Sequence, residues 1–497
     1  MKTKTKSLSL LLPFSLISLA SVAALSQEVP RERLTKTFSS PNSLTEQCVA
    51  IAKLPMGDYK SSDSEREQKL CAIDFYSDKV ALCPKTWSTS PGTIVSSFEG
   101  LASNVAQAET LCKYNSPLET EAKFKQTMNQ SDTSGTFAAS SILYYHMARA
   151  LNTTVGVPVA VYRSMDKDTH YDRVSSKARP SNSRMNVAGW NWLKNAEKNP
   201  ATYNAKSDLF TKDLKQVYGV LLKESGAHYG AEMIGVKDGN NELMNMQKTP
   251  GFLALKANGD LESSIAEGIR SAFTNPTMKT AFASVAPSKV QMVLWMNEIS
   301  EMTILDYIFS QQDRMDNIDY KWHWAYVDET GAVKTEEVKD DAFKKSSRAR
   351  MSRIPVPAAM AGKNAVLIQR TWLNDNDAGG RYEYANYAKS KGMITGLAGA
   401  TAPIAHLKAD MYHNLLKLAA DFKNKGPNYQ VLNTEVRPLG YTDAGDKRFN
   451  QLINNTIAIA QILEKNCSSG VLKLDLVSFK DAVKGQFVAP AASCTLQ

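Results

Sequence analysis

Residues 312–318 read QDRMDNI and residues 372–380 read WLNDNDAGG. These two acidic motifs lie about 60 residues apart, and each follows an apolar stretch. The stretch before the first motif has the periodicity of a helix, and the one before the second is typical of a strand. A loop carboxylate beside an amide, and a strand-end carboxylate before a glycine turn, are the forms that phosphoryl transfer uses. The pair therefore predicts two parts of one site.

Phosphoryl transfer requires positioning and the neutralisation of developing negative charge more than covalent work by the protein. Asp313 is predicted as the catalytic carboxylate that orients an acceptor hydroxyl. Mg²⁺ and Mn²⁺ prefer oxygen ligands, so Asn317 is predicted as a metal amide and Asp375 as the metal carboxylate. Asp377 is a second metal candidate and is able to exchange roles with Asp375.

Each motif also fits an ordinary structural role when it is taken alone. Acidic loops after helices are often caps and turns, and Asn376 and Asp377 are common turn residues. The pairing of the two motifs is what favours function. A lysine that contacts nucleotide phosphates is also needed, and Lys125 is selected by its place in a strand before a helix. Lys123 would point to the same side of that strand and is a substitute.

The N-terminus has the pattern of a secretory signal peptide over residues 1–26. Three lysines precede an apolar run that ends in small residues, and cleavage is expected near Gln27. A membrane anchor would need about 20 uninterrupted apolar residues, whereas Pro13 and several serines interrupt this run. Export is therefore expected, to a periplasm, the extracellular space or, in a eukaryote, the secretory lumen.

Export makes the six cysteines informative, because thiols tend to pair in an oxidising compartment. Cys467 and Cys494 form the natural C-terminal pair. Two further disulfides are expected among the other four cysteines, whose connectivity the sequence leaves open. Metal-binding spacings such as C-x₂-C are absent, so a zinc site is not indicated. Those four are Cys48, Cys71, Cys83 and Cys112.

The formal net charge is +9, and removal of the three signal-peptide lysines leaves about +6. That charge is mild for this length, and no nucleic-acid-binding motif accompanies it, so nucleic acid is not an expected partner. Residues 344–353 form one local basic cluster. It is consistent with a solvated loop or with contact to an acidic substrate or phosphate.

The apolar periodicity predicts a mixed order of strands and helices. The charged connection between the last two strands is too long for a simple hairpin. We expect helices over 43–54 and 97–111, a strand ending at 123–125, a helix to Asn152, a strand over 155–162, a loop over 166–204, a helix around 214–221, helices from 252 to 310, strands over 322–327 and 365–373, and helices over 406–422 and 449–463.

At these residues the chain resembles the atypical kinases of the secretory pathway, the family of the Golgi casein kinase and the proteoglycan xylose kinase. A more distant likeness connects it with phosphatidylinositol and HipA-type kinases. The resemblance covers about residues 113–425. It is carried by Lys123-Phe124-Lys125, by the helix at 145–151 with the Val-Pro strand 157–163, by Asp313-Arg314 and by Asp375-Asn376.

The resemblance implies an α+β, bilobal, protein-kinase-like fold with a small sheet-containing N-lobe and a mainly helical C-lobe. It also implies ATP with Mg²⁺ or Mn²⁺, Lys125 and Arg163 as cofactor-binding residues, and a hydroxyl-bearing protein, glycan or lipid headgroup as acceptor. The expected organisation is a signal peptide (1–26), a Cys-rich, disulfide-stapled helical extension (27–112), the N-lobe (113–165), the C-lobe with insertions (166–425) and a C-terminal helical extension with one disulfide (426–497).

The sequence departs from the family pattern at several positions. Ser141 stands where the family has a helix glutamate, and Glu119 and Glu121 are the acids nearby. Met315 replaces the histidine after Asp-Arg, and Asn317 follows Asp313 by four residues where kinases usually space the two by five, so Asp319 is an alternative ligand. A degenerate kinase that binds nucleotide without efficient transfer is therefore the main alternative.

Two other classes fit the sequence less well. A non-catalytic exported protein that binds Ca²⁺ would need acids at alternate positions closed by a distal glutamate, which neither motif has. A serine or zinc hydrolase would show a G-x-S-x-G or H-E-x-x-H motif, and the sequence has neither. If the kinase interpretation is right, Lys125, Asp313 and Asp375 should lie near one another.

Overall fold

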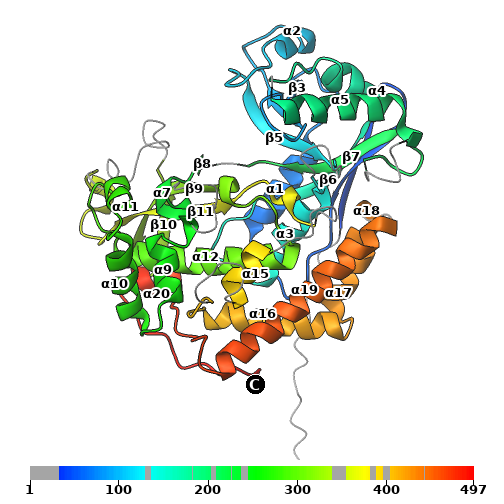
Figure 1. Cartoon of the computed structure of the whole chain (residues 1–497). Coiled ribbons are helices and arrows are strands. Elements are labelled where there is room, and N and C mark those ends of the chain that lie inside the picture. Colours follow the sequence, from blue (N-terminus) through cyan, green and yellow to red (C-terminus); the bar gives the residue numbers. More distant parts are fainter. Residues whose placement is uncertain are drawn as a thin grey trace, which may run out of the picture.

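The computed structural model describes residues 33–128, 136–181, 183–202, 209–224, 226–236, 245–338, 354–380, 388–395, 403–440 and 443–496. Within them the chain has a mixed α+β fold with two antiparallel sheets and many helices (Figure 1). The predicted signal peptide, the turn at 132–135 and the basic cluster at 344–353 lie outside the described residues.

The larger sheet is built from β1 (Leu34–Ser39), β2 (Thr45–Ala50), β3 (Val80–Pro84), β4 (Thr93–Ser97), β5 (Glu119–Gln126), β6 (Ala160–Asp166) and β7 (Gln216–Leu222). These strands lie in the order β1-β2-β6-β7-β5-β4-β3, and every neighbouring pair is antiparallel. The earliest strands therefore form both edges, and the later strands β6 and β7 lie near the centre.

The smaller sheet consists of β8 (Ala227–His228), β9 (Ile318–Val327), β10 (Val333–Glu337) and β11 (Val366–Leu373). Strand β9 pairs with the other three, all antiparallel. Strand β11 ends directly before the second acidic motif, and β9 begins directly after the first. This pairing brings the two motifs to the same end of the sheet.

Helices surround both sheets and fill the lower part of the molecule in Figure 1. Their bounds are α1 (Ser61–Ala72), α2 (Val105–Thr110), α3 (Ala138–Ala150), α4 (Lys167–His170), α5 (Arg184–Lys198), α7 (Ala231–Ile234), α9 (Pro250–Lys256), α10 (Leu261–Ala272), α11 (Pro276–Ala281), α12 (Lys289–Phe309), α15 (Ala388–Thr395), α16 (Ala409–Lys423), α17 (Pro427–Val431), α18 (Arg437–Gly440), α19 (Asp443–Ser468) and α20 (Phe479–Val483). Short turns of helix occur at η1 (Tyr171–Ser175), η2 (Met315–Asn317), η3 (Ala358–Met360), η4 (Asn376–Ala378) and η5 (Leu432–Val436).

Helix α12 is the central element of the helical part. Its residues from Gln291 to Phe309 are all buried, and it packs against α3, α9, α19 and β11. The helix is mainly apolar, and the polar side chains that it buries, such as Glu298 and Asp306, have hydrogen-bond partners within the core. The Ser288 hydroxyl caps its N-terminus by accepting from the Gln291 amide at 3.2 Å. It ends at Ser310, whose left-handed backbone (φ 50°) turns the chain into the first acidic motif.

The long and strongly patterned segments were predicted correctly. The strand ending at 123–125, the helix to residue 152, the long helix before the first motif and both strands around the charged connection are β5, α3, α12, β9 and β11. The helices predicted over 406–422 and 449–463 are α16 and part of α19. In each of these segments the apolar periodicity of the sequence and the packing onto the core favour the same secondary structure.

The helix predicted for residues 43–54 is wrong, because strand β2 occupies this segment. Apolar residues recur there over too short a run for periodicity to separate helix from strand. The disulfide of Cys48 and the pairing of β2 with β1 and β6 favour the extended form. The helical extension predicted over 27–112 therefore contributes four strands to the larger sheet, together with α1 and α2.

The helix predicted around residues 214–221 is also wrong, because this segment is strand β7. Strand β7 lies between β5 and β6, and Val217 through Leu222 are all buried. A strand covered on both faces has a continuous apolar run rather than alternation. The predicted strand 155–162 lies later, at Ala160–Asp166, and the predicted loop 166–204 contains α4 and α5.

Three disulfides stabilise the fold. Cys48 pairs with Cys71 and Cys83 with Cys112, which settles the connectivity that the sequence left open, and the predicted Cys467–Cys494 pair is confirmed. Cross-links that close loops of this size restrict the unfolded chain and typically contribute about 2–4 kcal/mol each. No helix in the described part of the chain is both long enough and apolar enough to cross a membrane.

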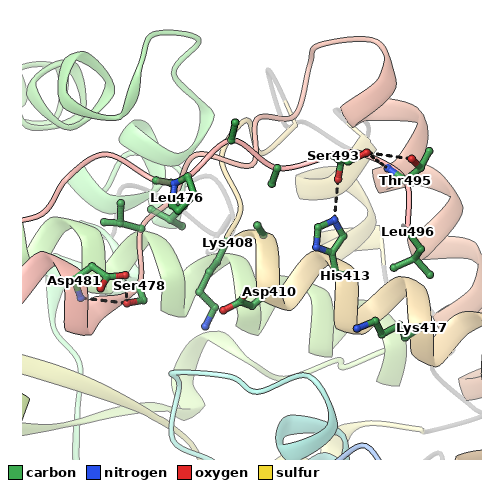
Figure 2. Close-up of a pocket in the computed structure, with 16 residues that line it drawn as sticks. Lys408, Asp410, His413, Lys417, Leu476, Ser478, Asp481, Ser493, Thr495 and Leu496 are labelled. Carbon is green, nitrogen blue, oxygen red and sulfur yellow. Dashed lines mark hydrogen bonds between the residues drawn. The ribbon is translucent and has the colours of Figure 1, made fainter. Parts of the chain in front are cut away.

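The last of these disulfides holds the C-terminal tail over α16. Between the tail, α16 and α20 lies a cavity of about 530 Å³ (Figure 2). His413 on α16 bonds the Ser493 carbonyl oxygen at 2.8 Å, and the N-cap Ser478 of α20 donates to Asp481. These contacts fix the tail as one wall of the cavity, and none of the lining residues belongs to the two acidic motifs.

Candidate functional site

The two acidic motifs lie against each other, joined by the buried side chain of Arg314. Its Nε donates to both carboxylate oxygens of Asp306 near the end of α12, at 3.0 and 3.1 Å. Its other nitrogens donate to the Asn374 carbonyl oxygen at 2.9 Å and to Asn376 Oδ1 at 2.8 Å. One cation therefore ties the end of α12 and the first motif to the end of β11.

Lys125 from β5 reaches the second motif from the other side. Its ammonium contacts the Asp375 carboxylate, lies 2.8 Å from Asp377 Oδ1 and lies 3.3 Å from Glu224 Oε1. Lys123, two residues earlier on the same strand, pairs with the other oxygen of Glu224. We call Lys123, Lys125, Glu224, Asp375 and Asp377 the charged cluster.

The backbone presents these carboxylates in a fixed arrangement. Asp375 has a left-handed backbone (φ 45°), a conformation that aspartate tolerates better than most residues. Its amide donates to Glu224 at 3.0 Å, and the Asp377 carbonyl oxygen accepts from the Phe137 amide at 2.7 Å. At Gly379 a Cβ atom would lie 2.6 Å from Ser140 Oγ, so the chain can approach α3 this closely only with glycine.

At most residues of the charged cluster, neighbouring opposite charges shift the pKa more than burial does. Burial alone lowers the pKa of Lys125, but the adjacent carboxylates, led by Asp375, raise it well above its ordinary value. Burial alone raises the pKa values of Glu224 and Asp375, but the lysine ammonium groups lower both below their usual range. Burial keeps the pKa of Asp377 raised in spite of Lys125. Asp377 is therefore the carboxyl of the cluster that takes up a proton most readily.

A third lysine, Lys85, lies close to the charged cluster. It follows β3 in the turn that leads to β4, and its amide donates to the Gly92 carbonyl oxygen at 2.8 Å. Burial lowers the pKa of Lys85, and the nearby Lys123 lowers it further, whereas Asp375 and Glu224 oppose both effects. The turn of the β3–β4 hairpin therefore brings additional positive charge to the cluster.

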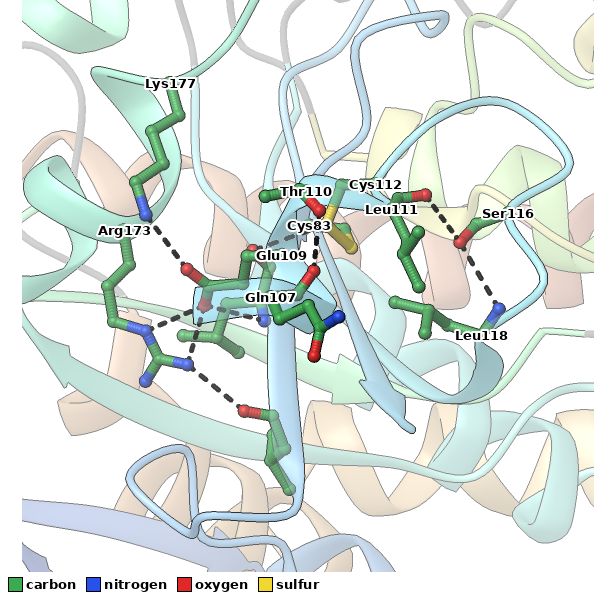
Figure 3. Close-up of a disulfide and its surroundings, with 12 residues drawn as sticks. Cys83, Gln107, Glu109, Thr110, Leu111, Cys112, Ser116, Leu118, Arg173 and Lys177 are labelled. Atoms are coloured by element: carbon green, nitrogen blue, oxygen red, sulfur yellow. Dashed lines mark hydrogen bonds and ion pairs between the residues drawn. A yellow bond between two sulfur atoms is a disulfide. The ribbon is translucent and has the colours of Figure 1, made fainter. Parts of the chain in front are cut away.

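This hairpin is firmly anchored (Figure 3). Cys83, near the end of β3, is bonded to Cys112 just after α2. Glu109 in α2 accepts from Arg173 at 2.7 and 2.9 Å and from Lys177 at 3.0 Å. The disulfide and the ion pairs hold α2 against the sheet, so the turn that carries Lys85 starts from a rigid base.

Arg163, which was predicted to bind the cofactor, lies outside the charged cluster. In the sheet register Arg163 is opposite Gly219, whereas Val220, the next residue, is opposite Lys125. Neighbouring positions along a strand point to opposite faces, so Arg163 and Lys125 lie on different faces of the sheet. Arg163 is fully buried, and its ion pair with Glu46 measures 3.3 Å. It is a structural residue of the opposite face.

Asp313 and Asn317 lie in the loop that Arg314 anchors. Asp313 is exposed, and its carbonyl oxygen accepts from the Asn317 side-chain amide. The Asn317 carbonyl oxygen also accepts from the Asn374 amide at 3.3 Å, so Asn317 links the two motifs. The alternative ligand Asp319 binds the Asn374 side chain and pairs with His228 at 2.6 Å.

Helix α3 has no glutamate for Lys125, because Ser141 occupies the expected position and is buried. Glu224, directly after β7, is the acidic partner instead. Glu224 was not among the predicted residues because β7 was taken for a helix, so the Lys-Glu pair after the buried run 217–222 was not recognised as a strand end. Nothing in the sequence marks Lys85 as a site residue, because its neighbours have only the pattern of a turn.

Strand β11 is positioned by a buried carboxyl group on α12. Glu298 accepts from the Thr371 amide at 2.9 Å and from the Thr371 hydroxyl at 2.5 Å. The Tyr229 hydroxyl lies 3.3 Å from the same hydroxyl and accepts from Trp295 at 3.1 Å. This network fixes the strand whose end carries Asp375.

Glu298 makes the free energy of unfolding dependent on pH. Burial raises the pKa of Glu298 to about 8, which is above the value expected in the unfolded chain, about 4.3. The folded state therefore holds a proton that the unfolded state releases, and stability from this group falls as pH rises from about 4 to 8. We expect Glu298→Gln, which mimics the protonated form, to become more stable relative to wild type by about 1 kcal/mol per pH unit over this range. Urea unfolding of both proteins at pH 5, 6.5 and 8 measures this difference, and a constant difference would contradict the assignment.

Among the described residues, no group of three or more histidine, cysteine, aspartate or glutamate side chains is arranged to hold a metal ion. The carboxylates of the charged cluster are arranged around the Lys125 ammonium instead. Of them, Asp375 reaches solvent most, with 34 % of its side chain exposed against 3 % for Asp377.

No family model and no curated protein sequence matches this chain.

Proposed function

We propose that this chain is an exported, kinase-like phosphotransferase that moves the γ-phosphate of ATP to a hydroxyl group on a protein or glycan. The contact of Lys125 with Asp375 and Asp377 is the observation that supports this most. Kinases use a strand lysine at the nucleotide phosphates and a strand-end carboxylate at the metal. The fold proposed with this activity is the bilobal one of the atypical secretory-pathway kinases.

The order of elements before Lys125 also favours a kinase-like site. In protein kinases a hairpin loop covers the phosphates, and the lysine follows on the next strand. Here the β3–β4 hairpin precedes β5, and α3 comes next. The hairpin turn carries Lys85 to the charged cluster, where a cation would oppose the negative charge of a phosphate.

Asp375 and Asp377 are suited to hold Mg²⁺ or Mn²⁺, because carboxylate oxygens are hard ligands. Asp375 is the more exposed of the two and would be the first ligand. When bound, the metal would neutralise charge on the phosphoryl group. Lys125 would then exchange part of its contact with the carboxylates for contact with a nucleotide phosphate.

Asp313 would orient the acceptor hydroxyl. It is exposed and directly precedes Arg314, which is held by Asp306 and by the second motif. A carboxylate on an anchored loop at the surface suits a macromolecular acceptor, because a bulky substrate does not have to enter the protein. Asn317 supports the same loop through the Asp313 carbonyl oxygen.

A degenerate kinase that binds nucleotide without transfer is the second candidate. The burial of Lys125, only 6 % exposed and surrounded by three carboxylates, favours it. Nucleotide would have to compete with these carboxylates for the ammonium. Phosphoryl transfer requires that a nucleotide phosphate displaces at least one of these carboxylates from the Lys125 ammonium.

The test is ATP consumption by the purified mature chain with Mn²⁺ or Mg²⁺ and a generic acceptor such as casein. We expect Asp375→Ala to lose at least about 100-fold of the activity, because removing one preorganised electrostatic group from an active site has an effect of this size. Asp410→Ala, which removes an exposed carboxylate on α16, is the matched control and should keep full activity. Equal activity in wild type and Asp375→Ala would defeat the proposal.

Nucleotide binding separates the two candidates. A rise in melting temperature with ATP and Mn²⁺, without any ATP consumption, would identify the degenerate form. No change in melting temperature and no consumption would exclude both and leave a non-catalytic exported binding protein.

A further inference from the structure

A second cavity lies apart from the carboxylates of the charged cluster, and its volume is about 430 Å³. Helix α1 forms one wall, the segment before β6 and the start of β5 form another, and the ends of β7, β9 and β11 complete it. The lining residues are Arg66, Lys69, Leu70, Ile73, Glu121, Pro158, Val159, Lys223, Lys321 and Trp372. Nothing in the proposed phosphotransfer chemistry uses this cavity.

Four cations and one carboxylate line the cavity, which leaves an excess of three positive charges. Arg66 and Lys69 lie three residues apart on α1 and so share one face of the helix. Lys223 directly follows β7, and Lys321 lies in the first half of β9. The single carboxylate, Glu121, already accepts from Ser97 at 3.0 Å.

Most of this positive charge is not neutralised by the protein. Arg66, Lys69 and Lys223 are exposed and make no ion pair or hydrogen bond with any described side chain. Lys321 pairs with Glu337 at 3.2 Å and lies 5.2 Å from the ring centre of Trp372. Like charges that converge without counter-ions raise the local concentration of anions.

The other residues that line the cavity are apolar. They are Leu70, Ile73, Pro158, Val159 and Trp372. Ligand sites commonly combine such an apolar surface with a few charged groups that fix orientation. Cations from α1 and from the two sheets, together with apolar lining, suit a compact molecule that has an apolar middle and anionic groups at both ends.

We infer that this cavity binds a small ring-containing organic polyanion, such as a sugar that carries two phosphate, sulfate or carboxylate groups. Arg66 and Lys69 hold one anionic group, Lys223 and Lys321 hold the other, and Trp372 packs against the ring. The cavity adjoins the charged cluster through the chain, because Lys223 precedes Glu224 and Trp372 lies three residues before Asp375. A ligand here therefore contacts both segments that carry the acidic partners of Lys125.

The test is isothermal titration calorimetry of the mature chain with fructose 1,6-bisphosphate, without ATP or metal. We expect saturable binding that weakens with added salt, as contacts between exposed charges do. Lys69→Ala/Lys223→Ala should weaken binding about tenfold, since each lost exposed charge pair contributes up to about 1 kcal/mol. Inorganic pyrophosphate, which lacks the ring, should bind more weakly than the sugar bisphosphate.

Two controls make the result specific. Lys480→Ala/Lys484→Ala removes two exposed lysines at α20 and should bind like wild type. Asp375→Ala should also bind the probe, so that failure of the phosphotransfer proposal does not affect this test. No saturable binding of the sugar bisphosphate, or equal binding by the Lys69→Ala/Lys223→Ala protein and wild type, would overturn the inference.

Discussion

Lys125→Met is expected to destabilise the protein by about 3–5 kcal/mol, because removing one partner of a buried ion pair leaves uncompensated charge. Lys125 is 6 % exposed, and its ammonium lies among the carboxylates of Asp375, Asp377 and Glu224. Without that ammonium Asp375 and Asp377 lose their cation and repel each other, whereas Glu224 keeps its pair with Lys123. Urea unfolding monitored by circular dichroism measures the change, and phosphotransfer should be lost as well.

Two further variants separate loss of charge from loss of packing. Lys125→Arg keeps the charge and should retain more stability than Lys125→Met. Adding Asp377→Asn to Lys125→Met should recover part of the loss, because one of the repelling carboxylates becomes neutral. If Lys125→Met unfolds at the same urea concentration as wild type, or if Asp377→Asn recovers nothing, the ion pairs do not contribute as described.

Arg314→Met is expected to have an effect of similar size, about 3–5 kcal/mol, through the same kind of uncompensated buried charge. Arg314 is 4 % exposed, and its loss leaves Asp306 buried on α12 without its cation. Burial already raises the pKa of Asp306 in spite of Arg314, so the carboxyl would take up a proton when the arginine is removed. The link from Arg314 to Asn374 and Asn376 is lost at the same time.

Arg314→Lys tests the geometry of this link. Lysine keeps the charge but has no planar fork for a carboxylate and two loop oxygens, so we expect an intermediate loss. Arg270→Met is the matched control, because the Arg270 side chain is 76 % exposed and pairs only with a neighbour on its own helix. A surface substitution of this kind usually changes stability by less than about 0.5 kcal/mol. Equal unfolding midpoints for Arg314→Met and Arg270→Met would contradict the central position given to Arg314.

The sequence predicted the centre of the candidate site better than its surroundings. Lys125 and Asp375 are in contact, and Asp313 lies on a loop bonded to the second motif. These residues follow or belong to long, strongly patterned segments, α12, β5 and β11, in which local pattern and burial agree. The contact between Lys125 and Asp375 could be predicted only from the family resemblance, because 250 residues separate the two in the sequence.

The incorrect predictions around the site concern strands whose burial on both faces removes the expected alternation of apolar and polar residues. Strand β7 is covered on both faces, so its apolar run does not alternate, and Glu224 at its end was missed. The cofactor-binding role of Arg163 came from the family resemblance of the strand 157–163, whereas β6 starts five residues later than the strand predicted from residue 155. Period-two geometry makes the face of a side chain depend on exact register, which a single sequence does not reveal.

The strand order of the larger sheet also sets an order of assembly. The hairpins β1–β2 and β3–β4 and the disulfides Cys48–Cys71 and Cys83–Cys112 lie within residues 34–112, so both edges can form before the central strands are available. They remain unconnected until β5, β6 and β7 have emerged, because β6 and β7 lie between them. Contacts between distant segments form slowly. The chain must therefore keep two open-edged hairpins from aggregating until the residues up to Leu222 can pair with them, because unpaired strand edges are prone to associate.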